Sequence, residues 1–369
     1  MSVDRTQESL AKIEQVRSWL GGSGLAGVLL ESNAGFSWVT AGGEGYVVVS
    51  EDGAAAAVLI TPDRAAVLTP NIEAARLADE ELPEGCFEVV EYPWHAPGSR
   101  GELISGIAGT GTVGSDSPSN EMPAAGPGLK ELRRVLVQPE IDRCRELAQD
   151  AAFVVESACR AVSPKDSELE MAARVAALCY ERNILPVVNL VAADDRISRY
   201  RHPLPTSMRA ARTFLAALTA RRAGLHASVT RTVCFGDPDP EQAGRHAACA
   251  RIDARMIGAS RPGTALSKVL AEAAAQYEAE GHPDEWRNHH QGGTTGYAGR
   301  EVFATPDEEY QIKAGQALTW NPSVAGAKSE DTILVTDRGT EVLSTSGHWP
   351  MLEVDAGGGT LGRPGLLVR

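Results

Sequence analysis

Residues 286–301 read WRNHHQGGTTGYAGRE, and this stretch decides how the fold of the chain is interpreted. Two adjacent histidines, His289 and His290, precede a glycine-rich backbone, an aromatic residue and the pair Arg300 and Glu301. Glycines let a backbone approach a ligand closely, and an arginine presents a fork of donors that fits a carboxylate. Taken alone, such a stretch is as typical of an ordinary turn as of a binding loop. The segments around it therefore carry the interpretation.

Three further segments hold side chains that are capable of chemistry. His202 lies in a polar, proline-rich segment, and a histidine there can move protons near neutral pH. Glu330 precedes a short apolar run, where a carboxylate can bind a metal, act as a base or cap a turn. In the strand-like run at residues 228–235, alternation places Thr230 and Thr232 on one face and Arg231 on the other. Each of these residues, considered singly, is more often structural than functional.

The composition excludes several classes of protein. A formal net charge of -14 over 369 residues disfavours nucleic acid and anionic membranes as partners, because both attract basic surfaces. The polar start shows no secretory signal, and no apolar run reaches the roughly 18 residues of a membrane span. We therefore expect a cytoplasmic protein whose six scattered cysteines are reduced thiols.

The pattern of apolar residues and breakers predicts two domains. Residues 1–135 read as an α/β domain, residues 136–355 as an α+β sheet domain, and residues 356–369, which begin with a run of three glycines, as a flexible tail. Helices are predicted at 4–20, 72–82, 140–161, 167–182, 240–258 and 266–280, and strands at 26–30, 45–49, 55–60, 65–68, 187–192, 213–218, 228–235, 316–321 and 332–335.

Taken together and in this order, these segments resemble the superfamily of creatinase, aminopeptidase P and methionine aminopeptidase, family M24. The N-terminal part, with NAGFSWVT at residues 33–40, is similar to the creatinase N-terminal domain. The resemblance implies a fold in which this α/β domain is followed by a pita-bread domain made of two pseudo-symmetric helix-and-sheet halves. It also implies a homodimer, in which residues near Trp38 or Tyr46 line the partner's pocket.

Metal-dependent members of this superfamily hold two divalent ions with two aspartates, one histidine and two glutamates. The resemblance places the following residues at those positions: Ala217, Ser228, Gly293 or Thr294, Asn321 and Glu330. Hard divalent ions need several charged oxygen or imidazole ligands. One carboxylate is too few, so the resemblance predicts a member that has lost its metal ligands and uses no metal and no cofactor.

Creatinase, a metal-independent relative, offers a model for such a site. His202 matches the histidine that serves creatinase as acid and base, and Arg300 matches an arginine that holds the substrate carboxylate. Creatinase has glutamates where this chain has Asn321 and Thr230, and those glutamates grip the guanidinium group of creatine. Creatine is therefore not expected as the substrate, and a neutral or anionic molecule fits better.

The leading hypothesis is a metal-independent hydrolase or lyase acting on a C–N bond of a small molecule. His202 would be the general acid and base, and Glu330 would orient a water or a substrate amine. The residues predicted to position the substrate are His289, His290, Tyr297, Arg300, Glu301, Asn321 and Thr230. Two alternatives stay open: a metallopeptidase of the Xaa-Pro aminopeptidase or dipeptidase type, and a non-catalytic binding protein on the same fold.

Overall fold

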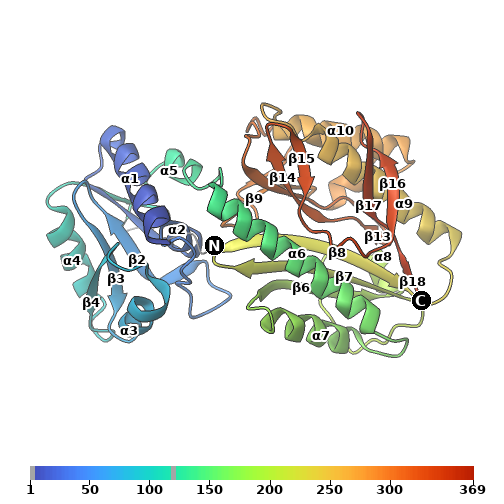
Figure 1. Cartoon of the computed structure of the whole chain (residues 1–369), viewed down its shortest axis with the longest axis horizontal. Helices are drawn as coiled ribbons and strands as arrows, with labels where there is room; N and C mark the ends of the chain where they lie inside the picture. Colours follow the sequence, from blue (N-terminus) through green and yellow to red (C-terminus); the bar gives the residue numbers. More distant parts are fainter. Residues whose placement is uncertain (1–4, 118–121) are drawn as a thin grey trace. The chain divides into compact units, whose positions relative to one another are not determined.

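A computed structural model describes residues 5–117 and 122–369 of the chain (Figure 1). It divides into two compact units, Met1–Arg134 and Val135–Arg369. The sequence placed this division after residue 135. Each unit has its own sheet and its own buried core, so each is described by itself.

The first unit is built on a five-stranded sheet with strand order β4-β3-β2-β1-β5. The pairs β1–β2 and β2–β3 are antiparallel, whereas β3–β4 and β1–β5 are parallel. Leu29, Leu59 and Leu68 form its core together with Ile104. The elements are α1 (Arg5–Ser23), β1 (Gly27–Ser32), α2 (Asn33–Val39), β2 (Gly53–Ile60), β3 (Ala65–Pro70), α3 (Ala74–Arg76), the π-helical turn η1 (Leu77–Glu81), β4 (Glu88–Tyr92), α4 (Ser99–Ala108), β5 (Val113–Ser115) and α5 (Pro127–Glu131).

One expectation for this unit is wrong. The strand predicted at 45–49 is irregular backbone, and Val47, Val48 and Val49 are about half exposed. Three consecutive apolar residues without alternation give a strand no single face to bury, so the hydrophobic run misleads. Trp38 itself is buried against α1, where Lys12 Nζ lies 5.8 Å from the centre of its ring, and the expectation that residues near Trp38 or Tyr46 line a partner's pocket stays a prediction.

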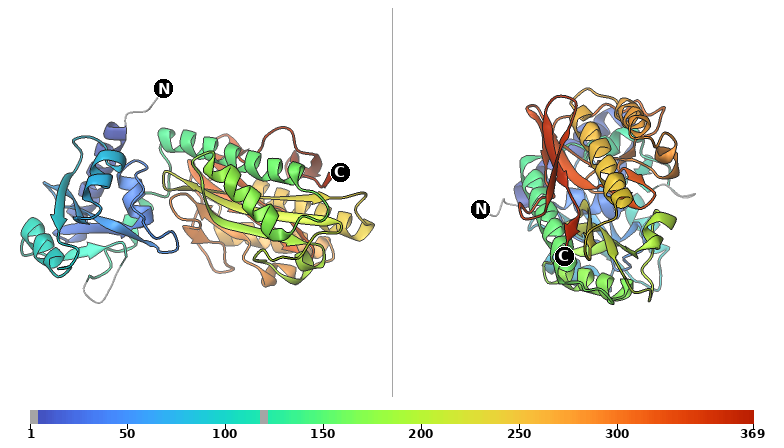
Figure 2. Two further views of the ribbon diagram at one scale, coloured as in Figure 1. Left: turned by 90° about the horizontal axis from the view of Figure 1, so that it is seen from below. Right: turned by 90° about the vertical axis from the view of Figure 1, so that its right-hand side faces the viewer.

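The second unit contains two larger sheets, each covered by a pair of helices, and two two-stranded sheets, β12-β13 and β16-β17 (Figures 1 and 2). The first sheet has the order β18-β8-β7-β6, with α6 packed on β7 and β8 and α7 on β6. The second has the order β10-β9-β11-β14-β15, and its core includes residues of α9 and α10. The helices are α6 (Gln138–Ala161), α7 (Glu168–Tyr180), α8 (Asp195–Arg199), α9 (Pro240–Ala259), α10 (Leu266–Ala279) and the 3-10 turn η2 (Glu285–Asn288).

The strands of this unit follow from local chemistry as well as from burial. β7 and β8 form a hairpin whose turn residues, Ala223 and Gly224, both have positive φ, as the tightest hairpins require. The strands are β6 (Leu185–Ala193), β7 (Thr213–Arg222), β8 (Leu225–Cys234), β9 (Gly292–Thr295), β10 (Val302–Phe303), β11 (Gln316–Trp320), β12 (Ser323–Val324), β13 (Ala327–Lys328), β14 (Asp331–Thr336), β15 (Gly339–Val342), β16 (Met351–Asp355), β17 (Thr360–Pro364) and β18 (Leu367–Val368).

The predicted flexible tail at 356–369 is wrong. Its glycines turn the chain between β16 and β17, with Gly357 at φ 81° and Gly359 at φ 153°, and β18 then pairs in parallel with β8. Arg363 on β17 is fully buried and pairs with Asp253 and Asp331, at 2.6 Å each. Glycines suit a tight turn as well as a loose end, so composition alone could not separate the two.

Two further observations concern the described part of the chain. No helix there is long and apolar enough to cross a membrane. The cysteines are free thiols, and all of them are buried.

Candidate functional site

A cavity of about 230 Å³ opens in the second unit, between the two sheets. Its apolar wall comes from β6 and β7 and includes Val187, Leu190 and Leu218. The sheets are joined beside it, because the backbone N–H of Thr230 on β8 donates to the carbonyl of Glu330 at 3.0 Å. The polar lining consists of His202, Thr219, His226, His290, Arg300, Asn321, Lys328 and Glu330.

Glu330 lies at the centre of the charged part of this cavity. Its Oε2 accepts hydrogen bonds from Thr230 Oγ1 at 2.6 Å and from Lys328 Nζ at 2.8 Å. Its Oε1 lies 3.7 Å from Arg300 Nη2. Burial raises the pKa of Glu330, but the charges of Lys328 and Arg300 outweigh burial, so its pKa stays below the ordinary value. Glu330 is therefore an ionised, strongly held carboxylate.

Sequence reasoning missed Thr219 and His226 of this lining, and it also missed Lys328. Its side chain is only 10% exposed and its ammonium group binds Glu330. A signal was present: Lys328 and Glu330 are two residues apart in an extended segment, and such residues share a face. With Lys328 included, two cationic side chains surround one carboxylate, so the charged lining is positive overall.

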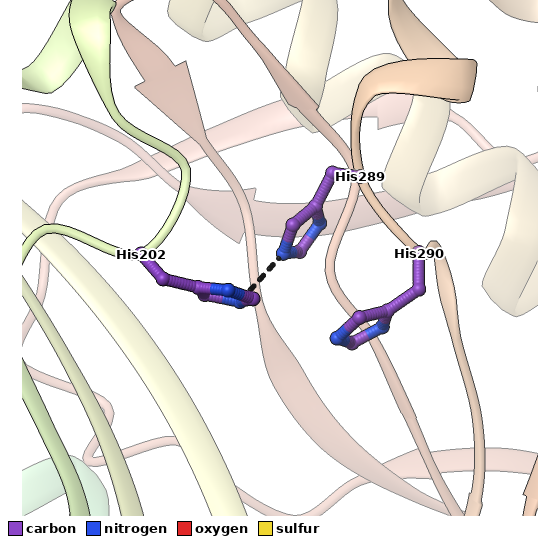
Figure 3. A group of neighbouring side chains, drawn as sticks. All are labelled: His202, His289 and His290. Carbon is purple, nitrogen blue, oxygen red and sulfur yellow. Dashed lines mark hydrogen bonds between the residues drawn. The ribbon is translucent and has the colours of Figure 1, made fainter.

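Three imidazoles gather at the cavity: His202 from the loop before β7, and His289 and His290 from the loop before β9 (Figure 3). The Nε2 atoms of His202 and His289 are 2.9 Å apart, and the rings of His289 and His290 are stacked at 4.5 Å. One imidazole of the 2.9 Å pair must donate a proton and the other must accept it. Figure 3 shows this contact as a dashed line.

Burial and nearby cations keep these imidazoles neutral near pH 7. Burial, followed by the charge of Lys328, lowers the pKa of His289 to about 3. Burial, followed by Arg300 and Lys328, lowers the pKa of His290 to about 4. The pKa of His202 is lowered for the same first two reasons as that of His289. A neutral imidazole can accept a proton from a reacting group, so these groups are in the form that a general base needs.

Two polar atoms at the cavity have no hydrogen-bond partner among the described residues. One is Nε of Arg300, whose Nη1 donates to the carbonyl of Gly299 at 2.6 Å. The other is Oδ1 of Asn321, a residue that is 2% exposed. Buried polar atoms without partners are costly. Both atoms have almost no accessible surface, so a molecule in the cavity could contact them only after the side chains shift.

Tyr297, Glu301 and Thr230, which were predicted to position the substrate, do not line the cavity. Tyr297 is buried and its hydroxyl donates to Glu140 Oε1 on α6 at 2.8 Å, so it fastens a helix rather than a ligand. Glu301 is not among the residues that line the cavity, and its backbone N–H donates to the carbonyl of Thr294. Thr230 contacts Glu330 but does not itself line the cavity.

The positions that the resemblance assigned to metal ligands lie on β7, β8, β9 and the ends of β11 and β14. Ala217 and Asn321 line the cavity, whereas Ser228 is buried against Thr219, with their hydroxyl oxygens 3.0 Å apart. Gly293 has φ 154°, and a Cβ there would lie 2.0 Å from the carbonyl oxygen of Val302. No side chain fits at that position on this backbone.

Comparison with known proteins agrees with this architecture. The model of "Metallopeptidase family M24" matches residues 142–337. A curated Xaa-Pro dipeptidase from Pyrococcus furiosus is 23% identical over 229 residues, which cover 58% of this chain but only 64% of that relative.

Two solved structures are similar over almost the whole chain. An Xaa-Pro dipeptidase from Bacillus anthracis superposes with a TM-score of 0.78 at 19% identity, covering 98% of this chain and 100% of that one. A prolidase from Pyrococcus horikoshii OT3 has the same TM-score and identity, covering 91% of this chain and 98% of the other. These likenesses confirm the predicted fold, an N-terminal α/β domain followed by a pita-bread domain.

Proposed function

Because the chain belongs to metallopeptidase family M24, we propose that it is a hydrolase or lyase of that fold which cleaves a C–N bond of a small anionic molecule without the family's metal pair. One observation carries the proposal. Glu330, the sole carboxylate among the described residues that line the cavity, is already bound by Lys328 and lies beside Arg300.

The charge balance of the cavity argues against two divalent ions. Such ions need several anionic oxygen ligands each, and here one carboxylate faces two cationic side chains. A histidine at position 293 would collide with the backbone of Val302. The neighbouring buried carboxylate, Asp331, is bound by Arg231 and Arg363 and is not free to turn. The residues present do not fit the metal pair.

The charges of Lys328, Arg300 and Glu330 also indicate which kind of substrate fits the cavity. Lys328 and Arg300 together exceed the charge of Glu330 by one, so an anionic group entering the cavity restores balance. A carboxylate can pair with the ammonium of Lys328 or the guanidinium of Arg300, and an N–H of the same molecule can donate to Oδ1 of Asn321 after a shift of that side chain. The substrate is therefore proposed to be a small acid that carries an amide, amidine or amine nitrogen.

His202 is the proposed general acid and base. It takes the proton of a water molecule as the oxygen of that water bonds to the substrate carbon, and it returns the proton to the nitrogen as the C–N bond breaks. His289 Nε2, 2.9 Å from His202 Nε2, fixes the tautomer of His202. Oε1 of Glu330, the carboxylate oxygen that Lys328 does not bind, orients the water or the substrate amine.

The test is release of ammonia or amine from a panel of N-acyl and amidino acids, by protein freed of metal with a chelator that is then removed. We expect activity to survive chelation, and His202→Ala to lower turnover about 10²- to 10⁴-fold. His348→Ala, which changes an exposed histidine, is the control. Activity that disappears on chelation and returns with Mn²⁺ or Co²⁺ would overturn the metal-free proposal.

The relatives favour a second candidate, an Xaa-Pro dipeptidase. The Pyrococcus furiosus relative and the Bacillus anthracis structure are both named as Xaa-Pro dipeptidases. Hydrolysis of Xaa-Pro dipeptides that increases with Mn²⁺ and is lost in Glu330→Gln would decide for it. If neither panel is turned over while small acids still bind, the chain acts as a binding protein.

A homodimer is a further proposal, which rests on the family resemblance. Light scattering during size-exclusion chromatography is expected to give twice the chain mass of 39.0 kDa. A particle of one chain mass at micromolar concentration would contradict it.

A further inference from the structure

We propose that His202, His289 and His290 form a binding site for one Zn²⁺ ion, separate from the carboxylate positions at which the family holds its metal pair. Each histidine offers one ring nitrogen, and the three nitrogens lie within 4.8 Å of one another. Figure 3 shows the three rings brought together from two loops. Imidazole nitrogen is a preferred ligand of zinc, and three histidines with an open fourth position form a familiar zinc geometry.

The spacing of the nitrogens is close to what one ion requires. Two nitrogens bound to the same tetrahedral zinc at about 2.0–2.1 Å lie about 3.4 Å apart. The Nε2 atoms of His202 and His289 are 2.9 Å apart, so a small rotation of either ring opens the required distance. In the absence of an ion, those two nitrogens share one proton. A zinc ion would take the place of that proton and accept the lone pairs of both nitrogens.

The two loops that carry the histidines are held in place by other contacts. The carbonyl of His289 accepts from Gln291 Nε2 at 2.6 Å, and Gln291 Oε1 accepts from the buried hydroxyl of Tyr277 at 2.9 Å. On the other side, Arg201, next to His202, pairs with Glu285 and donates to Ser323 Oγ at 3.2 Å. Ligands on such braced loops lose little freedom when an ion binds, and this favours affinity.

The surroundings determine which ion suits the site. All three ligands are nitrogen, which favours Zn²⁺ over Mg²⁺ and Mn²⁺, since those ions prefer oxygen. Lys328 and Arg300 add positive charge nearby, and Glu330 offsets only one of them. The ion is therefore expected to bind together with an anion or hydroxide at its fourth position. Nδ1 of His289, which has no partner in the described part of the chain, can bind a water once its ring ligates the ion.

The consequence for activity rests on the proposed function, whereas the binding does not. A zinc ion on His202 Nε2 would leave the proton of that imidazole on Nδ1, so the ring could no longer accept a proton from water. Zinc should therefore inhibit the metal-free reaction, and a chelator should restore it. Binding can be measured without a substrate, so failure of the proposed reaction leaves this test intact.

The experiment is isothermal titration of the metal-free full chain with Zn²⁺ and, separately, with Mn²⁺. We expect one Zn²⁺ per chain and an affinity for Mn²⁺ at least about 100-fold weaker. His289→Gln and His202→Gln should each weaken zinc binding by more than about 100-fold, beyond the 10- to 100-fold typical of losing an outer-shell contact. His348→Gln is the matched control and should leave the affinity unchanged.

X-ray absorption of the zinc-loaded wild-type chain tests the same site without a substitution, so its result does not depend on whether the variants fold. A first shell that contains three imidazole nitrogens is the expected result. Two ions per chain that are both lost in Glu330→Gln would place the metal at the family's carboxylate positions and overturn the proposal. Zinc affinity that is unchanged in correctly folded His202→Gln and His289→Gln would also overturn it.

Discussion

Glu330 and Asp331 are neighbours in the chain, yet they belong to two very different charge clusters. Asp331 faces the interior, where it pairs with Arg231 at 3.0 Å and Arg363 at 2.6 Å and accepts from Ser344 Oγ at 2.7 Å. Glu330 faces the cavity, where Lys328 and Arg300 surround it. Adjacent residues of an extended chain point to opposite sides, so one short segment serves both clusters.

The two clusters differ in the sign of their excess charge and in whether they border a cavity. In the interior cluster, two cations, Arg231 and Arg363, face three carboxylates, Asp253, Asp331 and Glu156. At the cavity, two cations, Lys328 and Arg300, face one carboxylate. The interior network is buried and holds the fold, whereas the positive cluster lines a cavity that an anionic ligand can enter.

The largest effect is expected when the interior cluster is broken. Arg363→Met leaves Asp253 and Asp331 without their shared buried cation, and removing one partner of a buried pair costs about 3–5 kcal/mol. Urea unfolding should show a loss of that size in the free energy of unfolding. Arg145→Met, which breaks an exposed pair with Glu341, is the control and should cost at most about 1 kcal/mol. Equal losses in the two variants would show that the interior cluster stabilises the fold no more than an exposed ion pair does.

Breaking the cavity cluster should affect ligand binding more than stability. Lys328→Met removes one of the two cations that are proposed to attract an anion. We expect the affinity for N-acetylglycine, a small acid with an N–H, to fall about 10- to 100-fold, as for loss of a hydrogen bond to a charged group. Ligand-observed NMR measures this, with the exposed Lys268→Met as control. Unchanged affinity would show that Lys328 serves only to hold Glu330.

The neutral imidazoles predict how stability depends on pH. The pKa of His289 is about 3 in the folded chain, whereas an unfolded histidine has a pKa of about 6.5. Below pH 6.5, His289 therefore binds a proton in the unfolded state but not in the folded state. The free energy of unfolding consequently falls until the pH approaches 3. The slope from one such group is at most about 1.4 kcal/mol per pH unit.

The measurement is the free energy of unfolding of wild type and His289→Gln at several pH values between 6.5 and 4. The wild-type value should fall more steeply than that of the variant, and His348→Gln should follow wild type. Parallel curves for wild type and His289→Gln would mean that His289 is not held neutral.

The smallest effect is expected at Tyr297. Tyr297→Phe removes a hydrogen bond to Glu140 and should cost about 1 kcal/mol of unfolding free energy. Affinity for N-acetylglycine should not change, because the hydroxyl points to α6 and not to the cavity. A marked loss of affinity in a fully stable variant would return Tyr297 to the substrate site.

Much of the fold could be predicted because local chemistry and burial agree. The helix predicted at 167–182 is observed as α7, where Ser167 is the capping residue and accepts from the Glu170 N–H at 3.1 Å. The errors occurred where composition allows two outcomes. The glycines at 357–359 were interpreted as a loose end, yet they form the turn that carries Arg363 into the core.

The candidate site was predicted in part. His202, Arg300, Asn321 and Glu330 were singled out from the sequence, and the structure brings them to one cavity. Lys328 was missed because a lysine in an extended segment usually faces solvent. Tyr297 and Glu301 were assigned to the cavity because they are close to Arg300 in the chain, and chain proximity does not determine which way a side chain points.

The sequence by itself determined most of the periodic elements and the two-domain order. Those features depend on residue type and on spacing over short stretches of chain, and both can be read from the sequence alone. Only the tertiary structure decided that Arg300 comes to lie 3.7 Å from Glu330, that three histidines from two loops meet, and that Arg363 lies between two aspartates. Each of these is a contact between segments distant in the chain, and its geometry exists only after the sheets have packed.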